Sequence, residues 1–82
     1  MKLKGRSGTI HDLPNAEILD GILYIKYGRP LGVMDLIRLR LLEEDTKGME
    51  YEKIYIEFPR FEDEEAQRLF FQYGFDGISK PL

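Results

Sequence analysis

The dipeptide Asp20-Gly21 constrains the fold of this chain more than any other feature of its sequence. It separates two β-prone runs, residues 16–19 and residues 22–27. A two-residue hairpin loop of type I′ needs a positive φ at both central positions, and Asp-Gly is one of the pairs that meet this need. We therefore expect an antiparallel hairpin at this point. Its second run opens with four consecutive apolar residues, which predicts a strand covered on both faces.

A helix is predicted after the hairpin, over residues 31–44. A Gly-Arg-Pro turn at residues 28–30 interrupts the strand, and apolar side chains then recur at helical spacing. The stripe expected to face the core is Met34, Ile37 and Leu41, broadened by Val33, Leu36 and Leu42.

The second half of the chain repeats the order of strand and helix. Residues 51–58 alternate between apolar and polar side chains, which predicts a half-buried strand with Lys53, Tyr55 and Glu57 on its outer face. Residues 62–73 have helical periodicity, and Gly74 is placed to cap that helix. The apolar face of this second helix is expected at Ala66, Leu69, Phe70 and Tyr73, and residues 75–79 form a last short strand.

This order of elements predicts the α+β class, with a β-hairpin followed by helix, strand, helix and strand in one mixed sheet with two packed helices. A right-handed crossover would make strands 22–27 and 51–58 parallel. We expect a single α+β domain over residues 1–82, in which residues 1–15 form an extended N-terminal segment with a short strand near residues 9–11. Ten aromatic side chains supply much of the core that so short a chain needs.

Composition excludes several classes of function. The chain has no cysteine, which excludes disulfides, thiolate metal sites and a cysteine nucleophile, and which fits a cytoplasmic location. No run reaches the ~18 apolar residues of a transmembrane helix, so we expect no membrane partner. Residues 42–82 carry five Lys/Arg against eleven Asp/Glu, and this acidity disfavours nucleic acid as a partner. Few amides and dense charge are typical of thermophile proteins.

Three successive carboxylates, Glu43, Glu44 and Asp45, stand at the predicted end of the first helix. They face the negative end of the helix dipole and unpaired backbone carbonyls, which is unfavourable unless something offsets it. A bound divalent cation, calcium first, would offset it, because carboxylate and carbonyl oxygens suit such ions. Glu50 and Glu52 lie close enough in sequence to join this metal site.

The alternative at the acidic turn needs no ligand, because Arg40 can pair with Glu44 and Lys47 can cap the helix. The pattern is not an EF-hand, since Lys47 and Ile54 occupy positions where that loop needs oxygen ligands. In length and acidity the chain is also similar to small calcium-associated proteins of methanogens. We therefore keep weak calcium binding and a solvated acidic turn as competing predictions.

Two stretches resemble the C-terminal half of the N-acetyltransferases of the GNAT family. Residues 29–34, Arg-Pro-Leu-Gly-Val-Met, follow a strand and open a helix, as the pyrophosphate loop does in that family. Residues 66–75, Ala-Gln-Arg-Leu-Phe-Phe-Gln-Tyr-Gly-Phe, are similar to its motif Ala-x-x-Leu-Tyr-x-x-x-Gly-Phe. The resemblance implies an acyl-coenzyme A-binding remnant with Arg29 and Gly32 as cofactor-binding residues. Phe70 replaces the family's tyrosine acid, so acetyl transfer is not implied.

No complete catalytic constellation is present, so we expect a small non-enzymatic binding domain with no catalytic residues. A divalent cation is the first expected ligand, and acyl-coenzyme A is the alternative. A third prediction is a protein-interaction module, which would dock a basic partner on its acidic half or pair its edge strand with another chain. Tyrosines on the predicted strands would either expose an aromatic face or pack half-buried in the sheet; these are Tyr24, Tyr27, Tyr51 and Tyr55.

Overall fold

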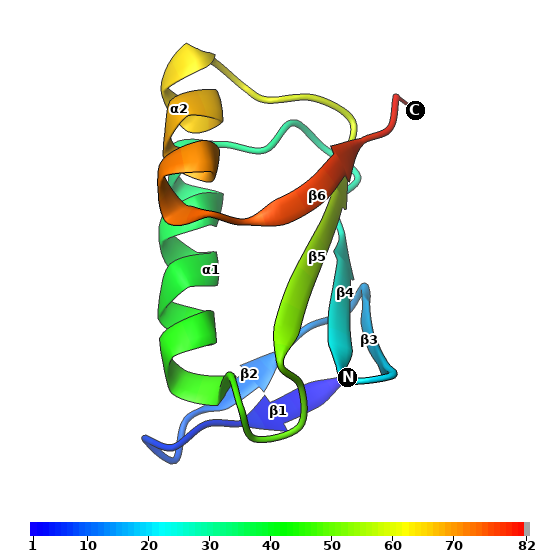
Figure 1. Ribbon diagram of the computed structural model, residues 1–82, viewed down its shortest axis with the longest axis vertical. Helices are drawn as coiled ribbons and strands as arrows, with labels where there is room; N and C mark the ends of the chain where they lie inside the picture. Colours follow the sequence, from blue (N-terminus) through cyan, green and yellow to red (C-terminus); the bar gives the residue numbers. More distant parts are fainter. Residues whose placement is uncertain (82) are drawn as a thin grey trace.

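The computed structural model describes residues 1–81 and arranges them in two layers, a sheet and a pair of helices (Figure 1). The elements are β1 (Lys2–Lys4), β2 (Ile10–Asp12), β3 (Ala16–Leu19), β4 (Ile22–Lys26), α1 (Val33–Thr46), β5 (Lys53–Phe58), α2 (Glu64–Tyr73) and β6 (Asp76–Ser79). The mixed sheet has the strand order β3-β4-β5-β6, while β1 and β2 form a separate antiparallel pair. The predicted α+β class is confirmed.

The hairpin of β3 and β4 is confirmed with the predicted turn. Asp20 has φ 52° and Gly21 has φ 76°, and the two strands are antiparallel with Leu19 opposite Ile22. The prediction that the second strand is covered on both faces is wrong. Only alternate side chains of β4, such as Leu23, are buried, while Tyr24 on the other side is half-buried.

Both crossovers leave the same face of the sheet uncovered. β4 pairs with β5 in parallel, as predicted, and β5 pairs with β6 in parallel. Successive right-handed crossovers in one direction place their helices on one side, and Figure 1 shows α1 and α2 together on one side of the sheet. The other side, which we call the open face, carries Glu17, Leu19, Ile22, Tyr24, Lys26, Lys53, Tyr55, Glu57, Asp76 and Ile78.

Helix α1 begins and ends two residues later than expected, and its predicted core stripe is right only in part: Leu36 and Leu42 are buried, but Met34 and Leu41 are not. Met34 and Leu41 are each 59% exposed. The buried side chains of α1 are Asp35, Leu36, Leu39, Leu42 and Thr46. Two of these residues are polar, and hydrogen bonds from Arg29 to Asp35 and from Thr46 to the Leu42 carbonyl satisfy them. The helix is apolar on two sides, so periodicity alone could not identify the buried one.

Helix α2 agrees with its prediction. Ala66 and Phe70 are buried, and Leu69 and Tyr73 pack against the core. The helix begins two residues later than expected because Asp63 is its N-cap, accepting a hydrogen bond of 2.8 Å from the amide of residue 66. Gly74 ends it with φ 73°, the left-handed conformation that favours glycine at a C-cap.

The N-terminal residues form a hairpin rather than only an extended segment. β2 lies close to the short strand predicted near residues 9–11, and β1 pairs with it through Leu3 opposite His11. Leu3 is buried and attaches the hairpin to the core. The loop between these strands, residues 5–9, contacts the C-terminal end of α1. No helix within residues 1–81 is long and apolar enough to cross a membrane.

Candidate functional site

The predicted acidic turn is neutralised mainly within the protein. Arg40 Nη1 lies 3.2 Å from Glu43 Oε1, and Arg40 Nε lies 3.6 Å from Glu44 Oε1. The pairing of Arg40 with Glu44 that sequence suggested is therefore present, and Glu43 shares the same guanidinium. Two of the three successive carboxylates thus have an intramolecular cation on their own helix.

Asp45 is held by the loop of the N-terminal hairpin. Its Oδ2 lies 2.7 Å from His11 Nε2 and accepts a 2.8 Å hydrogen bond from Ser7 Oγ, and its Oδ1 accepts one of 2.9 Å from the Ser7 amide. Gly5 allows this approach, because a Cβ there would collide with the Asp45 carboxylate. The bonds from His11 and then Ser7 lower the Asp45 pKa to about 2.

Arg6 supplies the charge that sequence reasoning missed. Its Nη1 donates a 3.1 Å hydrogen bond to the Glu44 carbonyl, and its Nη2 donates to the Lys47 carbonyl. These are carbonyls at the end of α1 that the helix itself leaves without a donor. The contact joins residues about forty positions apart, so no local pattern signals it. The unfavourable charge at the helix end is therefore offset by side chains of the protein.

The five predicted metal ligands are not brought together around one point. Glu43 and Glu52 line one small pocket of about 80 Å³, which Lys47 and Lys53 also line. Asp45 faces the hairpin loop instead, and Glu50 is exposed. Among residues 1–81 no three His, Cys, Asp or Glu side chains are grouped so that they could hold a metal ion. Calcium binding at this turn stays a prediction, without a preformed cage.

The contacts of Asp45 also bring a serine, a histidine and an aspartate together. In a hydrolytic triad the histidine lies between the other two and takes the proton of the serine. Here Asp45 is in the middle, so Ser7 Oγ donates to a carboxylate and not to an imidazole. A carboxylate with a pKa of about 2 is a poor general base at neutral pH. The cluster fastens the hairpin, and we assign it no catalytic role.

Lowering the pH should weaken the contact between Asp45 and the N-terminal hairpin in a defined pH range. The folded pKa of Asp45, about 2, lies below its ordinary value of 3.8, so the contribution of Asp45 to stability is present above about pH 4. It is lost as the pH falls toward 2. We expect Asp45→Asn to be less stable than the native chain at pH 7 and equal to it near pH 2 in urea denaturation. Asp12→Asn, on the exposed side of the same hairpin, is the control.

The predicted cofactor residues Arg29 and Gly32 meet at the start of α1. Gly32 is the N-cap, and its amide donates a 2.9 Å hydrogen bond to Asp35 Oδ2. Both terminal nitrogens of Arg29 donate to the same carboxylate, at 2.6 and 2.8 Å. Burial alone would raise the pKa of Asp35, but the bonds from Arg29 and Gly32 outweigh it and lower that pKa. They hold the carboxylate ionised.

This arrangement leaves little for a pyrophosphate to bind. The helix-end amide that would face the phosphates already has a carboxylate acceptor. The Glu62 carboxylate lies where a Cβ on Gly32 would be, so a second negative charge borders the loop. Like charges repel a phosphate group. Burial, followed by the charge of Asp35, raises the pKa of neighbouring Tyr27 to about 12, so that phenol stays neutral. Coenzyme A binding here stays a prediction.

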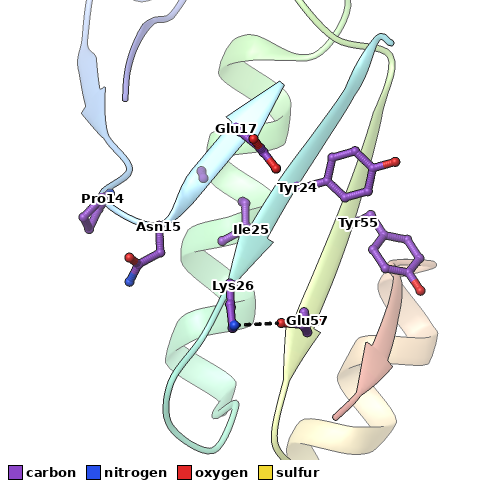
Figure 2. A pocket seen from close by; sticks show the side chains of 9 residues that line it. Pro14, Asn15, Glu17, Tyr24, Ile25, Lys26, Tyr55 and Glu57 are labelled. Carbon is purple, nitrogen blue, oxygen red and sulfur yellow. Dashed lines mark ion pairs between the residues drawn. The ribbon is translucent and has the colours of Figure 1, made fainter. Parts of the chain in front are cut away.

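A hollow lies on the open face, and its lining contains none of the predicted metal or cofactor residues. It has a volume of about 560 Å³, and its lining includes residues 14–17 of β3 and the preceding turn, together with Tyr24 and Tyr55 (Figure 2). We call it the tyrosine groove. A second hollow, of about 490 Å³, shares residues 14–16 and extends toward Arg29. Known ligand pockets span roughly 300–1,000 Å³, so the groove has a sufficient size.

The register of the sheet places the two tyrosines side by side. Tyr24 is opposite Tyr55 in the parallel β4–β5 pair, and their ring centroids are 5.8 Å apart with planes tilted by 58°. On β3, Glu17 lies opposite Tyr24, and on β6, Asp76 lies opposite Tyr55. A row of side chains therefore crosses the open face, with a carboxylate at each end and two half-buried aromatic rings between them.

Most charges on the open face are paired with one another. Glu57 lies 3.4 Å from Lys26 Nζ and 3.6 Å from Lys80 Nζ, and Lys53 Nζ lies 3.2 Å from Asp76. Figure 2 shows the pair of Lys26 and Glu57 at one end of the tyrosine groove. Glu17 differs from the others, because within residues 1–81 no cation lies within ion-pair distance of it.

Sequence reasoning found part of this site. Alternation in residues 51–58 correctly placed Lys53, Tyr55 and Glu57 on one face. The pairing of Tyr24 with Tyr55 depends on a register between strands nearly thirty residues apart, which no local signal specifies. No protein-family model, curated protein or solved structure matches this chain.

Proposed function

We propose that this chain is a small non-enzymatic binding domain that holds an extended polypeptide segment in the tyrosine groove. The observation that carries the proposal is the pair Tyr24 and Tyr55, which lies at the middle of a sheet face that neither helix covers. Tyrosine combines a large apolar surface with a polar hydroxyl, and it is enriched where proteins bind one another.

The edge of the sheet beside the groove supports a polypeptide as the ligand. β3 is the first strand in the sheet order, so within residues 1–81 one of its sides has no neighbouring strand. Such an edge presents backbone donors and acceptors to which an extended segment can pair. Residues 14–17 belong both to this edge and to the lining of the groove. A bound segment could therefore follow β3 and extend side chains over the tyrosine rings.

The other two predicted ligands have less support from the described contacts. The carboxylates Glu43, Glu44 and Asp45 each have a cation or hydrogen-bond donor of this chain. At the start of α1, the Gly32 amide is already bonded to Asp35. In the tyrosine groove, by contrast, the two rings are half-exposed and accessible to a ligand. It also agrees with the third prediction from the sequence, a protein-interaction module.

A peptide titration tests the proposal. Short host peptides of glycine, serine and threonine, with arginine, lysine, leucine or glutamate at the centre, would be added to the labelled protein. We expect at least one of them at millimolar concentration to shift the amide resonances of residues 15–18, Tyr24 and Tyr55. Tyr24→Ala and Tyr55→Ala should each raise its Kd about fivefold or more, which corresponds to about 1 kcal/mol.

Phe71→Ala is the matched control for loss of an aromatic ring. Phe71 lies on α2 and is 66% exposed, but it is remote from the open face. Its replacement should leave the Kd unchanged. The proposal is wrong if none of the four peptides shifts the open face, or if the tyrosine variants bind as well as the native chain while remaining folded by circular dichroism.

A further inference from the structure

On the basis of the proposed function, we infer that the tyrosine groove selects an arginine side chain of the bound polypeptide. The guanidinium would stack on the ring of Tyr24 and direct its nitrogens to the carboxylate of Glu17. Within residues 1–81 Glu17 has no ion pair, and it lies opposite Tyr24 in the sheet. Two arginines elsewhere in the protein each contact a tyrosine and a carboxylate.

Among residues 1–81, the ion pairs around the groove leave Glu17 as its unpaired carboxylate. The lining contains the carboxylates of Glu17 and Glu57 and the ammonium of Lys26, and both Lys26 and Lys80 lie within ion-pair distance of Glu57. Glu17 is exposed and has no ion pair with residues 1–81. A ligand that brings a positive charge next to Glu17 would give this carboxylate an ion-pair partner.

The sheet geometry places that carboxylate close to an aromatic ring. Directly opposite residues in an antiparallel pair have Cβ atoms about 4.5–5.5 Å apart, and Glu17 is opposite Tyr24. Figure 2 shows the Glu17 side chain extending from β3 toward the strand that carries Tyr24. The face of a tyrosine ring is negative and attracts cations. The carboxylate and the ring therefore lie on adjacent strands of the open face, with the Tyr24 ring directed toward Tyr55 (Figure 2).

The protein itself contains this recognition unit twice. The Arg29 guanidinium lies 5.7 Å from the centre of the Tyr27 ring while it binds Asp35. The Arg40 guanidinium lies 5.4 Å from the centre of the Tyr73 ring while it binds Glu43. In each case one arginine contacts a tyrosine and a carboxylate together. Glu17 and Tyr24 are the same two kinds of group, placed opposite one another on neighbouring strands of the open face.

Arginine fits this unit better than lysine does. A guanidinium is planar, so it can stack on a ring and still present a fork of donors to a carboxylate. An ammonium is compact and strongly hydrated, and it makes a weaker contact with the ring. We therefore expect the order of affinity among the host peptides to be arginine, lysine, leucine and then glutamate.

The experiment combines those peptides with charge variants of the groove. Glu17→Gln should weaken binding of the arginine peptide two- to fivefold, the range for an exposed cation contact, and should leave binding of the leucine peptide unchanged. Glu17→Lys should reverse the preference, so that the glutamate peptide binds more tightly than the arginine peptide. Glu50→Gln, an exposed glutamate in the loop before β5, is the control and should change nothing.

The outcomes separate this inference from the proposed function. If leucine or glutamate peptides bind the native groove more tightly than the arginine peptide, the arginine inference is wrong and the binding surface stands. The same holds if Glu17→Gln binds the arginine peptide normally while Tyr24→Ala does not. If no host peptide shifts the open face, both fail. Binding of the arginine peptide should also weaken as salt is raised, because the contact is exposed.

Discussion

Replacing Leu36 by alanine is expected to lower the free energy of unfolding by about 2–5 kcal/mol, the range for a buried leucine truncated in a core. Leu36 is fully buried on the side of α1 that faces the sheet. A chain of 82 residues has a total stability of about 4–12 kcal/mol, so the loss is a large part of it. Urea denaturation followed by circular dichroism would measure the change.

Leu41→Ala provides the matched control for Leu36→Ala. Both leucines lie on α1, so helix propensity changes by the same small amount. Leu41 is 59% exposed, and its truncation should change stability by less than about 0.5 kcal/mol. Periodicity in the sequence assigns both leucines to the core stripe, whereas in the structure Leu36 is buried and Leu41 is exposed. A larger loss for Leu41→Ala than for Leu36→Ala would contradict the buried face described above.

Gly77→Ala should destabilise the edge of the sheet by about 1–3 kcal/mol, the usual cost of overpacking. A Cβ at Gly77 would collide with the backbone carbonyl oxygen of Ile56 on the neighbouring strand. Backbone cannot turn aside as a flexible side chain can, so β6 must move away from β5. We expect the amides of residues 76–79 to lose protection from hydrogen exchange before those of β4 do.

Gly28→Ala is the comparison for Gly77→Ala. Nothing lies within 4 Å of a Cβ built at Gly28, and its φ is not in the positive range. Its replacement should therefore change stability by less than about 0.5 kcal/mol. Equal effects of the two substitutions would mean that the loss arises from glycine itself and not from the close approach of β6 to β5.

At the acidic turn, the sequence correctly predicts the negative charge but does not predict most of the groups that compensate it. Negative charge does gather at the end of α1, as the sequence indicates. Arg40 on the same helix pairs with Glu43 and Glu44, and the N-terminal hairpin supplies further compensation, where Arg6 binds the helix carbonyls and His11 binds Asp45. The hairpin contacts join segments that no pattern in the sequence connects. The chain therefore stabilises its helix end without requiring the cation that the local pattern favoured.

Several elements could be predicted because their signals are local. The turn at Asp20-Gly21 depends on the φ values that two adjacent residues accept. The cap of α2 at Gly74 depends on one residue that tolerates a left-handed conformation. The outward position of Tyr55 follows from the two-residue period of a strand. In each case the interacting atoms are within a few positions of one another, so the amino-acid sequence by itself determined the outcome.

Three features of the protein are determined only by its tertiary structure. The buried side of α1 was chosen by contact with the sheet, because both sides are apolar and the buried one contains Asp35 and Thr46. Asp45 contacts His11 because the hairpin of β1 and β2 packs against the end of α1. The tyrosine groove exists only because β4 and β5 align Tyr24 with Tyr55. The physical reason is the same each time: these energies belong to pairs of residues far apart in sequence, and such pairs become neighbours only when the whole chain has folded.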